Sequence, residues 1–175
     1  MNSDLERLHR AIAYSLRGLD AEGTQLRPVG RPGRWSIQQV VEHLLLTYSA
    51  TEMAMDARLE KGIPARGRPS PLQHFVQFTL VRLGYFPRGR KAPEVVTPAE
   101  TETALSGEEL ARAADEHLER LDGLFAEGEK SLGTGRSVRH MVLGPMSMAQ
   151  WRRFHLIHGE HHVRQILAIR KAHRV

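Results

Sequence analysis

Four of the ten histidines of this chain lie within eight residues near its C-terminal end. The stretch FHLIHGEHHVRQI, residues 154–166, contains His155, His158, His161 and His162. Because a helix advances about 100° per residue, His155, His158 and His162 would share one face with apolar side chains. Burying an imidazole costs free energy unless its nitrogens find hydrogen-bond partners. The pattern therefore predicts that a partner satisfies the nitrogens of these rings.

His158 and His162 have the spacing of a helical metal-binding pair. Residues four apart are neighbours on a helix, and two imidazoles placed so can hold one ion at about 2.1 Å. The simpler alternative is a packed or solvated pair whose spacing is accidental. A metalloprotease is not indicated, because a zincin needs Glu where Gly159 stands and the reversed HxxEH pattern needs Glu where His161 stands.

A catalytic metal needs a third protein ligand and an open position. The candidates are the histidines that the apolar pattern places in or near the core, which are His43, His117, His140 and His155. For His117 and His155 the simpler interpretation is a histidine at the core edge with local hydrogen bonds. His140 lies in the loop that precedes the last helix.

Helix-start signals recur along the chain. A Ser followed three residues later by Glu or Gln can satisfy two backbone N–H groups reciprocally. The pattern occurs at Ser3, Ser36, Ser70, Ser106 and Ser147. These positions predict helices over about residues 3–19, 36–61, 70–83, 106–127 and 147–172, each with apolar residues at helical spacing.

The predicted fold is therefore all-α. Strand signals are almost absent, and four long amphipathic helices with one short helix indicate a four-helix bundle. The short helix, near residues 70–83, lies within a long connection between the second and third long helices. Length and composition favour one domain over residues 1–175.

Composition narrows the classes of function. The chain has no cysteine, no apolar run of signal-peptide or membrane-span length, and a formal net charge of +5. We expect a cytoplasmic protein without a membrane partner. A nucleic-acid partner is not favoured, because the basic residues lack interleaved aromatics and no helix-turn-helix signature is evident.

Two motifs, taken in order, resemble a known family. The segment W-S-I-x-x-x-x-x-H-L from Trp35 and H-x-x-H-H-x-x-Q-I from His158 are similar to the DinB/YfiT-like superfamily of metal-binding four-helix bundles. The stretch HMVLGPMSMAQWRRFHLIHGEHHVRQI further resembles a branch described only as a domain of unknown function. The resemblance covers the chain from Trp35 onward.

The resemblance implies a metal site and a class of chemistry. By motif, the metal ligands are His43, His158 and His162, and the cofactor is a divalent ion such as Zn, Ni, Mn or Fe. Similar proteins are described as metal-dependent hydrolases or as S-transferases that use low-molecular-weight thiols. The substrate is then a small molecule, which could be such a thiol, and the chain could form a homodimer. The alternative is a non-catalytic metal-binding or scaffold protein of the same fold.

The sequence does not identify a catalytic residue. Glu42, Glu116 and Tyr48 are polar residues near the candidate ligands, but each could be a helix-surface group. Gln165, one turn after His162, is a candidate to orient that ring. Between Glu60 and Glu94 the chain has seven basic residues and no acid, which favours either a basic cover that attracts an anionic substrate or a solvated surface.

Overall fold

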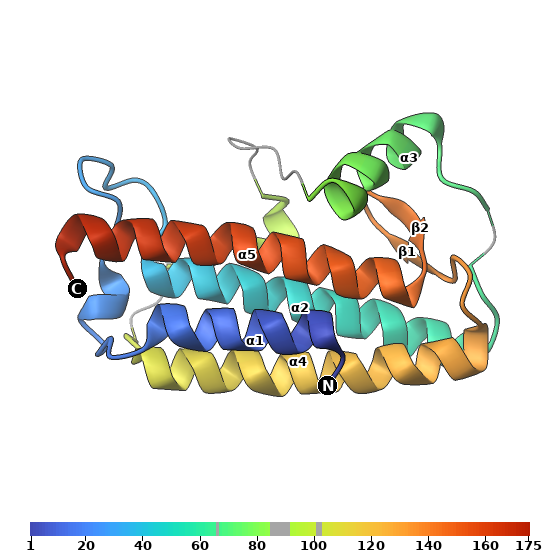
Figure 1. The fold of residues 1–175 in the computed structure, drawn as a ribbon, viewed down its shortest axis with the longest axis horizontal. Coiled ribbons are helices and arrows are strands. Elements are labelled where there is room, and N and C mark those ends of the chain that lie inside the picture. Colours follow the sequence, from blue (N-terminus) through green and yellow to red (C-terminus); the bar gives the residue numbers. More distant parts are fainter. Residues whose placement is uncertain (66, 85–91, 101–102) are drawn as a thin grey trace.

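The computed structural model describes residues 1–65, 67–84, 92–100 and 103–175 and shows a bundle of four long helices (Figure 1). They are α1 (Ser3–Leu16), α2 (Ile37–Lys61), α4 (Gly107–Leu132) and α5 (Met148–His173). Helix α1 packs against α4 and α5, and α2 packs against the same two helices from the other side. The predicted all-α four-helix bundle is confirmed.

Short elements fill the connections. They are η1 (Gly23–Gln25), α3 (Pro71–Gln77), a π-helical turn η2 (Phe78–Arg82), η3 (Glu94–Val96), β1 (Val138–His140) and β2 (Gly144–Met146). The predicted short helix is thus confirmed as α3, although its last turn widens into η2.

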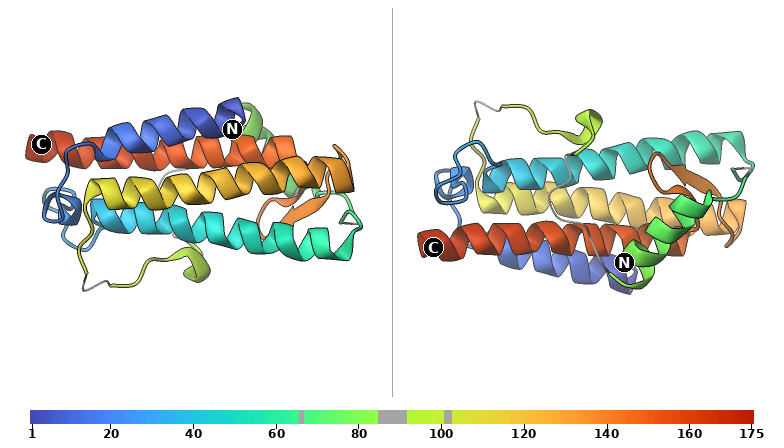
Figure 2. Two further views of the ribbon diagram at one scale, coloured as in Figure 1. Left: turned by 90° about the horizontal axis from the view of Figure 1, so that it is seen from below. Right: turned by 90° about the horizontal axis from the view of Figure 1, so that it is seen from above.

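The helix directions explain the long connection. Helices α1 and α5 run one way along the bundle, and α2 and α4 run the other way (Figures 1 and 2). Consecutive parallel helices require the chain to return along the full length of α2, which is about 37 Å at 1.5 Å per residue. Elements α3, η2 and η3 lie on this return path, and η3 packs against α2.

Four of the five predicted helix starts are confirmed. At Ser36, Ser70, Ser106 and Ser147 the Ser side chain accepts from the N3 amide and the N3 Gln or Glu side chain accepts from the Ser amide. The prediction for Ser3 is wrong, because Asn2 caps α1 through a 3.0 Å bond from the Asp4 amide. Asn caps a helix as well as Ser does, and it stands one residue earlier.

The small antiparallel hairpin β1–β2 was not expected from the sequence. Its two strands have three residues each, too few to show an alternating pattern. The turn is closed by a side chain, since Nδ1 of His140 accepts from the amides of Val142 at 3.0 Å and Leu143 at 3.1 Å. His140 is therefore a turn residue of the hairpin.

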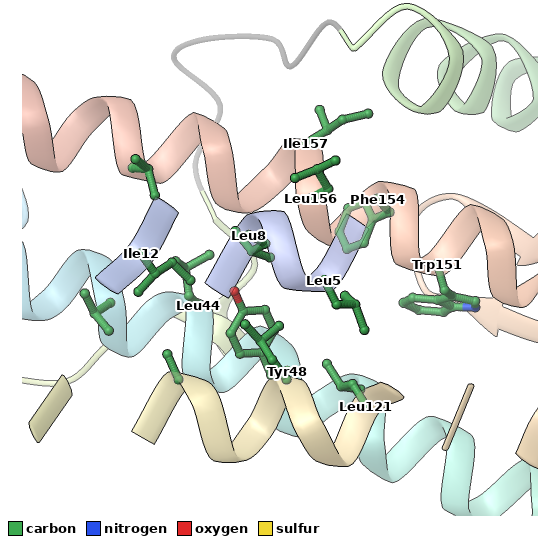
Figure 3. Packing of buried hydrophobic residues seen from close by; sticks show 14 of the residues in the cluster. Leu5, Leu8, Ile12, Leu44, Tyr48, Leu121, Trp151, Phe154, Leu156 and Ile157 are labelled. Carbon is green, nitrogen blue, oxygen red and sulfur yellow. The ribbon is translucent and has the colours of Figure 1, made fainter. Parts of the chain in front are cut away.

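The four helices contribute unequally to the core. The buried residues of α1 and α4 are mostly apolar, as Leu5, Leu8 and Ile12 of α1 are, and Figure 3 gives a close view of this packing. In α4, Leu118 is buried where the sequence favoured His117, which is partly exposed. Helices α2 and α5 bury several polar side chains as well, and this asymmetry locates the candidate site.

We expect Gly107→Ala to destabilise the protein. An ideal Cβ at Gly107 would lie 2.2 Å from the carbonyl oxygen of Leu16, which is main chain and cannot turn aside. Relieving this clash should cost about 1–3 kcal/mol of the free energy of unfolding, measured by urea denaturation. The control is Gly123→Ala on the same helix, where a Cβ meets nothing within 4 Å and should stabilise by up to about 1 kcal/mol. Equal effects of the two substitutions would contradict this packing.

Candidate metal centre

Three imidazole rings meet between α2 and α5. His43 comes from α2, and His158 and His162 come from successive turns of α5. The Nε2 atom of His158 lies 3.2 Å from Nε2 of His43 and 3.1 Å from Nε2 of His162. Each residue is only 5% exposed, and the three possible ligand atoms lie within 4.8 Å of one another. The structure thus brings together the three histidines that the family resemblance pointed to.

Hydrogen bonds at the far side of two rings fix their tautomers. Nδ1 of His43 lies 2.6 Å from the carbonyl oxygen of Val96 in η3. A carbonyl only accepts, so Nδ1 must carry the proton and Nε2 keeps its lone pair. In the same way Nδ1 of His162 donates to Oε1 of Gln165 at 2.9 Å, and Nε2 of Gln165 donates to Nε2 of His161 at 3.1 Å.

The converging nitrogens fit a divalent cation. With lone pairs on Nε2 of both His43 and His162, a proton on His158 can satisfy only one of its two neighbours. A metal ion satisfies all three nitrogens at once. Two nitrogen ligands at about 2.1 Å from one ion lie about 3.0–3.4 Å apart, and the observed 3.1 and 3.2 Å agree with this spacing.

The electrostatics favour the form of histidine that binds metal. Burial lowers the pKa of His43, places that of His158 well below its ordinary value and lowers that of His162 to about 3. The neighbouring rings of the cluster lower the pKa of His158 and His162 further. All three rings are therefore neutral at ordinary pH, as a metal ligand must be.

Aromatic rings flank the cluster. Phe154 stacks on His158 with ring centroids 5.4 Å apart and an angle of 8° between the planes. The ring centroids of Trp35 and His43 lie 5.0 Å apart. These apolar surfaces lower the local dielectric constant and strengthen any interaction with a charge in the site. The sequence did not indicate Phe154 or the Val96 carbonyl, because neither carries a motif and the carbonyl is set by the path of the connection.

The remaining candidate histidines have other environments. His117 donates from Nδ1 to Oε1 of Glu52 at 2.7 Å, a partner on the neighbouring helix rather than a local one. His155 is fully buried, and neither of its nitrogens has a hydrogen-bond partner within the described part of the chain. The interpretation as a core-edge histidine with a hydrogen bond therefore holds for His117, and it is wrong for His155. His161 lies at the partly exposed side of α5, next to Gln165.

The polar residues considered as general bases lie in three different settings. Oε1 of Glu42 accepts from Nε2 of Gln38 at 2.9 Å, Glu116 is exposed on α4, and Tyr48 is fully buried in the core. The carboxylates therefore have surroundings that suit ordinary helix-surface groups, and no catalytic residue is assigned.

The structure describes three of the seven basic residues that lie between Glu60 and Glu94. Lys61, Arg68 and Arg82 are exposed. The other four basic residues of this stretch, Arg66, Arg88, Arg90 and Lys91, lie outside the described residues.

Comparison with known proteins agrees with this geometry. A family model for the DinB superfamily matches residues 4–166, nearly the whole chain. The chain belongs to the DinB superfamily. No curated protein and no solved structure matches the chain in the corresponding searches. Within the part of the chain that the structure describes, no helix of this DinB-superfamily protein is long and apolar enough to cross a membrane.

We expect the protein to bind about one divalent ion per chain through this cluster. A ligand at 100 times its dissociation constant stabilises the folded state by about 2.7 kcal/mol, so Zn, Ni or Mn should raise the melting temperature. His158→Ala should abolish both the bound metal and the thermal shift, because it removes the ring that touches the other two. Metal analysis and thermal unfolding with and without chelator measure this. His74→Ala, at an exposed position of α3, is the control and should retain both effects.

We also expect the metal-free protein to lose stability in acid. Burial lowers the pKa of His140 to about 4, and burial with a smaller effect of His140 lowers that of His155 to about 3. The unfolded chain takes up protons at these positions below about pH 6.5, whereas the folded chain does not. The free energy of unfolding should therefore fall by about 1.4 kcal/mol per pH unit for each histidine as the pH drops from 6.5 toward 4.

His155→Phe tests this origin of the acid sensitivity. Between pH 7 and pH 5, the free energy of unfolding of the variant should decrease less than that of the wild type. The difference should equal the contribution of one histidine. Urea denaturation in the presence of a chelator measures it, with exposed His74→Phe as the matched control. Parallel pH profiles for wild type and His155→Phe would mean that His155 is not held neutral by the fold.

Proposed function

We propose that this DinB-superfamily protein is a metal-dependent enzyme that activates a small nucleophile, acting as a thiol-dependent S-transferase. The observation that carries the proposal is the convergence of three neutral, buried imidazoles between α2 and α5, in which Nε2 of His158 lies 3.1–3.2 Å from Nε2 of the other two. A divalent ion held by three neutral ligands keeps its full charge, acts as a Lewis acid and favours the deprotonated form of a thiol or water molecule.

The residues around the cluster prepare it for an ion. The Val96 carbonyl and the Gln165 amide each hold one ligand ring by its Nδ1–H, which points Nε2 toward the centre. Such outer partners commonly contribute tenfold to 100-fold to metal affinity. No carboxylate belongs to the ligand cluster found among the described residues, so the protein does not neutralise the charge it would bind.

The surroundings favour a thiol over water as the nucleophile. Trp35 and Phe154 flank the ligand rings, and the low exposure of those rings makes the site water-poor. A thiolate is larger and less strongly hydrated than hydroxide, so it loses less free energy on entering such a site. The same low exposure favours a small substrate, or one with a slender reactive end.

Hydrolysis is the second candidate, because a carboxylate-free site of this kind also suits the deprotonation of water. It uses water in place of a thiol, so the dependence on thiol separates the two reactions.

A thiol-dependence screen tests the proposal. The protein loaded with Zn, Ni, Mn or Fe(II) is incubated with electrophilic substrates and a set of low-molecular-weight thiols, and thiol consumption is followed. We expect turnover that needs both metal and thiol and that falls at least about 100-fold in His158→Ala but not in His74→Ala. Turnover without thiol would replace transfer by hydrolysis. Stoichiometric metal without any turnover would favour the non-catalytic metal-binding protein instead.

A further inference from the structure

The outward face of α3 is apolar. Leu72, Phe75 and Phe78, at the C-terminal cap of the helix, are 72%, 63% and 49% exposed. At 100° per residue these three positions lie within a sector of about 120° of the helix, on the side opposite the buried Gln77. Figures 1 and 2 show α3 on the outside of the bundle, next to the β1–β2 hairpin. The helix thus presents to solvent the kind of side chain that helices of globular proteins usually bury.

The polar side of α3 attaches the helix to the hairpin. Nε2 of Gln77, a residue only 3% exposed, donates to the carbonyl oxygens of Leu143 at 2.7 Å and Pro145 at 3.1 Å. The side chain of Gln73 lies so close to Gly144 that a Cβ there would be 2.5 Å from Oε1. Amide groups therefore hold the helix in place, and the leucine and phenylalanine side chains are left on the outside.

The two segments of the chain that meet here contain no acidic residue. Residues 61–93, which include α3, have seven Lys or Arg residues, and residues 130–159, which include the hairpin, have five. Neither segment has an Asp or Glu, although the whole chain has 20 of them. The segments are in contact, since the amide of Ala65 donates to the carbonyl of Ser137 at 2.7 Å and η2 packs against α5. This part of the protein is therefore strongly positive.

Basic side chains lie at both ends of the apolar face. Exposed Arg68 stands two residues before the cap of α3, and exposed Arg82 is the last residue of η2. Arg139 of β1 approaches the start of this segment, because a Cβ on Gly67 would lie 3.2 Å from its Nη2 atom. Of the other basic residues, Arg152 and Arg153 pair with Glu129 and Asp4 of other helices, and Arg66, Arg88, Arg90 and Lys91 lie outside the described residues, so only their charge is counted.

We propose that the apolar face of α3 binds the surface of an anionic lipid membrane. A helix with Leu and Phe on one side and Arg at its ends suits the interface, where the apolar side chains enter the acyl boundary and the cations meet the headgroups. The uncompensated positive charge selects an anionic surface over a zwitterionic one. Such binding needs no membrane-spanning run, so the composition that led us to expect no membrane partner does not bear on it. None of the metal ligands belongs to this face.

Co-sedimentation of the full chain with lipid vesicles tests the proposal. We expect binding to vesicles of about three parts phosphatidylcholine to one part phosphatidylglycerol, weaker binding at high salt, and little binding to phosphatidylcholine alone. The double substitution Leu72→Ser and Phe75→Ser should lower the partition coefficient at least about tenfold, because it removes two apolar anchors. Met53→Ser is the matched control, since Met53 is 70% exposed on α2, and should change it by less than about twofold.

A charge substitution gives a second readout at the same face. Arg82→Glu should weaken binding to the anionic vesicles about tenfold, whereas Arg164→Glu, an equal change of charge at an exposed position of α5, should weaken it much less. Equal effects of the two, or no binding of the wild type to anionic vesicles, would overturn the proposal. Self-association of the wild type that the double substitution abolishes, without vesicle binding, would assign the face to a second copy instead. None of these measurements depends on whether the protein is an enzyme.

Discussion

The central constraint on this structure is that three neutral imidazole rings lie together in an apolar core, which costs free energy because their nitrogens need partners. Nε2 of His158 lies within 3.2 Å of two other Nε2 atoms, and two of the three rings are held so that they cannot donate there. Such an arrangement is unfavourable by itself, because buried polar groups need partners of the opposite kind. A cation in this site would supply the missing partner, so folding and metal binding would be energetically linked.

This constraint is reflected in the kinds of residues that the four helices bury. Helices α1 and α4 supply mostly apolar faces that bury well without partners. Helices α2 and α5 also bury histidines and other polar residues. Some of these have partners in other elements, as His43 has in the Val96 carbonyl, whereas Thr47 and Thr51 donate to carbonyls one turn earlier in α2. Because α2 and α4 run parallel, the connection between them must return along the length of the bundle, and η3 on this return path brings the Val96 carbonyl to His43. The chain topology therefore determines one of the hydrogen bonds that orient the ligand rings.

Membership of the DinB superfamily and the cluster of three buried histidines support a metal-binding bundle. In the proposed enzyme, charge would govern the chemistry at the metal site. With neutral ligands and flanking rings from Trp35 and Phe154, a cation held there would be little screened, which under the proposed function would favour an anionic nucleophile beside it.

The sequence by itself determined the four long helices and the short helix α3, the Ser caps of four of these five helices, and the i, i+4 pair His158 and His162. These follow from local rules, since capping and helical periodicity act over a few residues. His43 was connected to that pair only through the family resemblance. Gln165, one turn after His162, could be named from the sequence as the partner of that ring. The tertiary structure decided the distances between the rings, the tautomer of His43 set by the Val96 carbonyl, the side-chain-closed hairpin and the burial of His155. Each of these depends on groups far apart in the chain or on main-chain atoms, which have no signature in residue type or spacing.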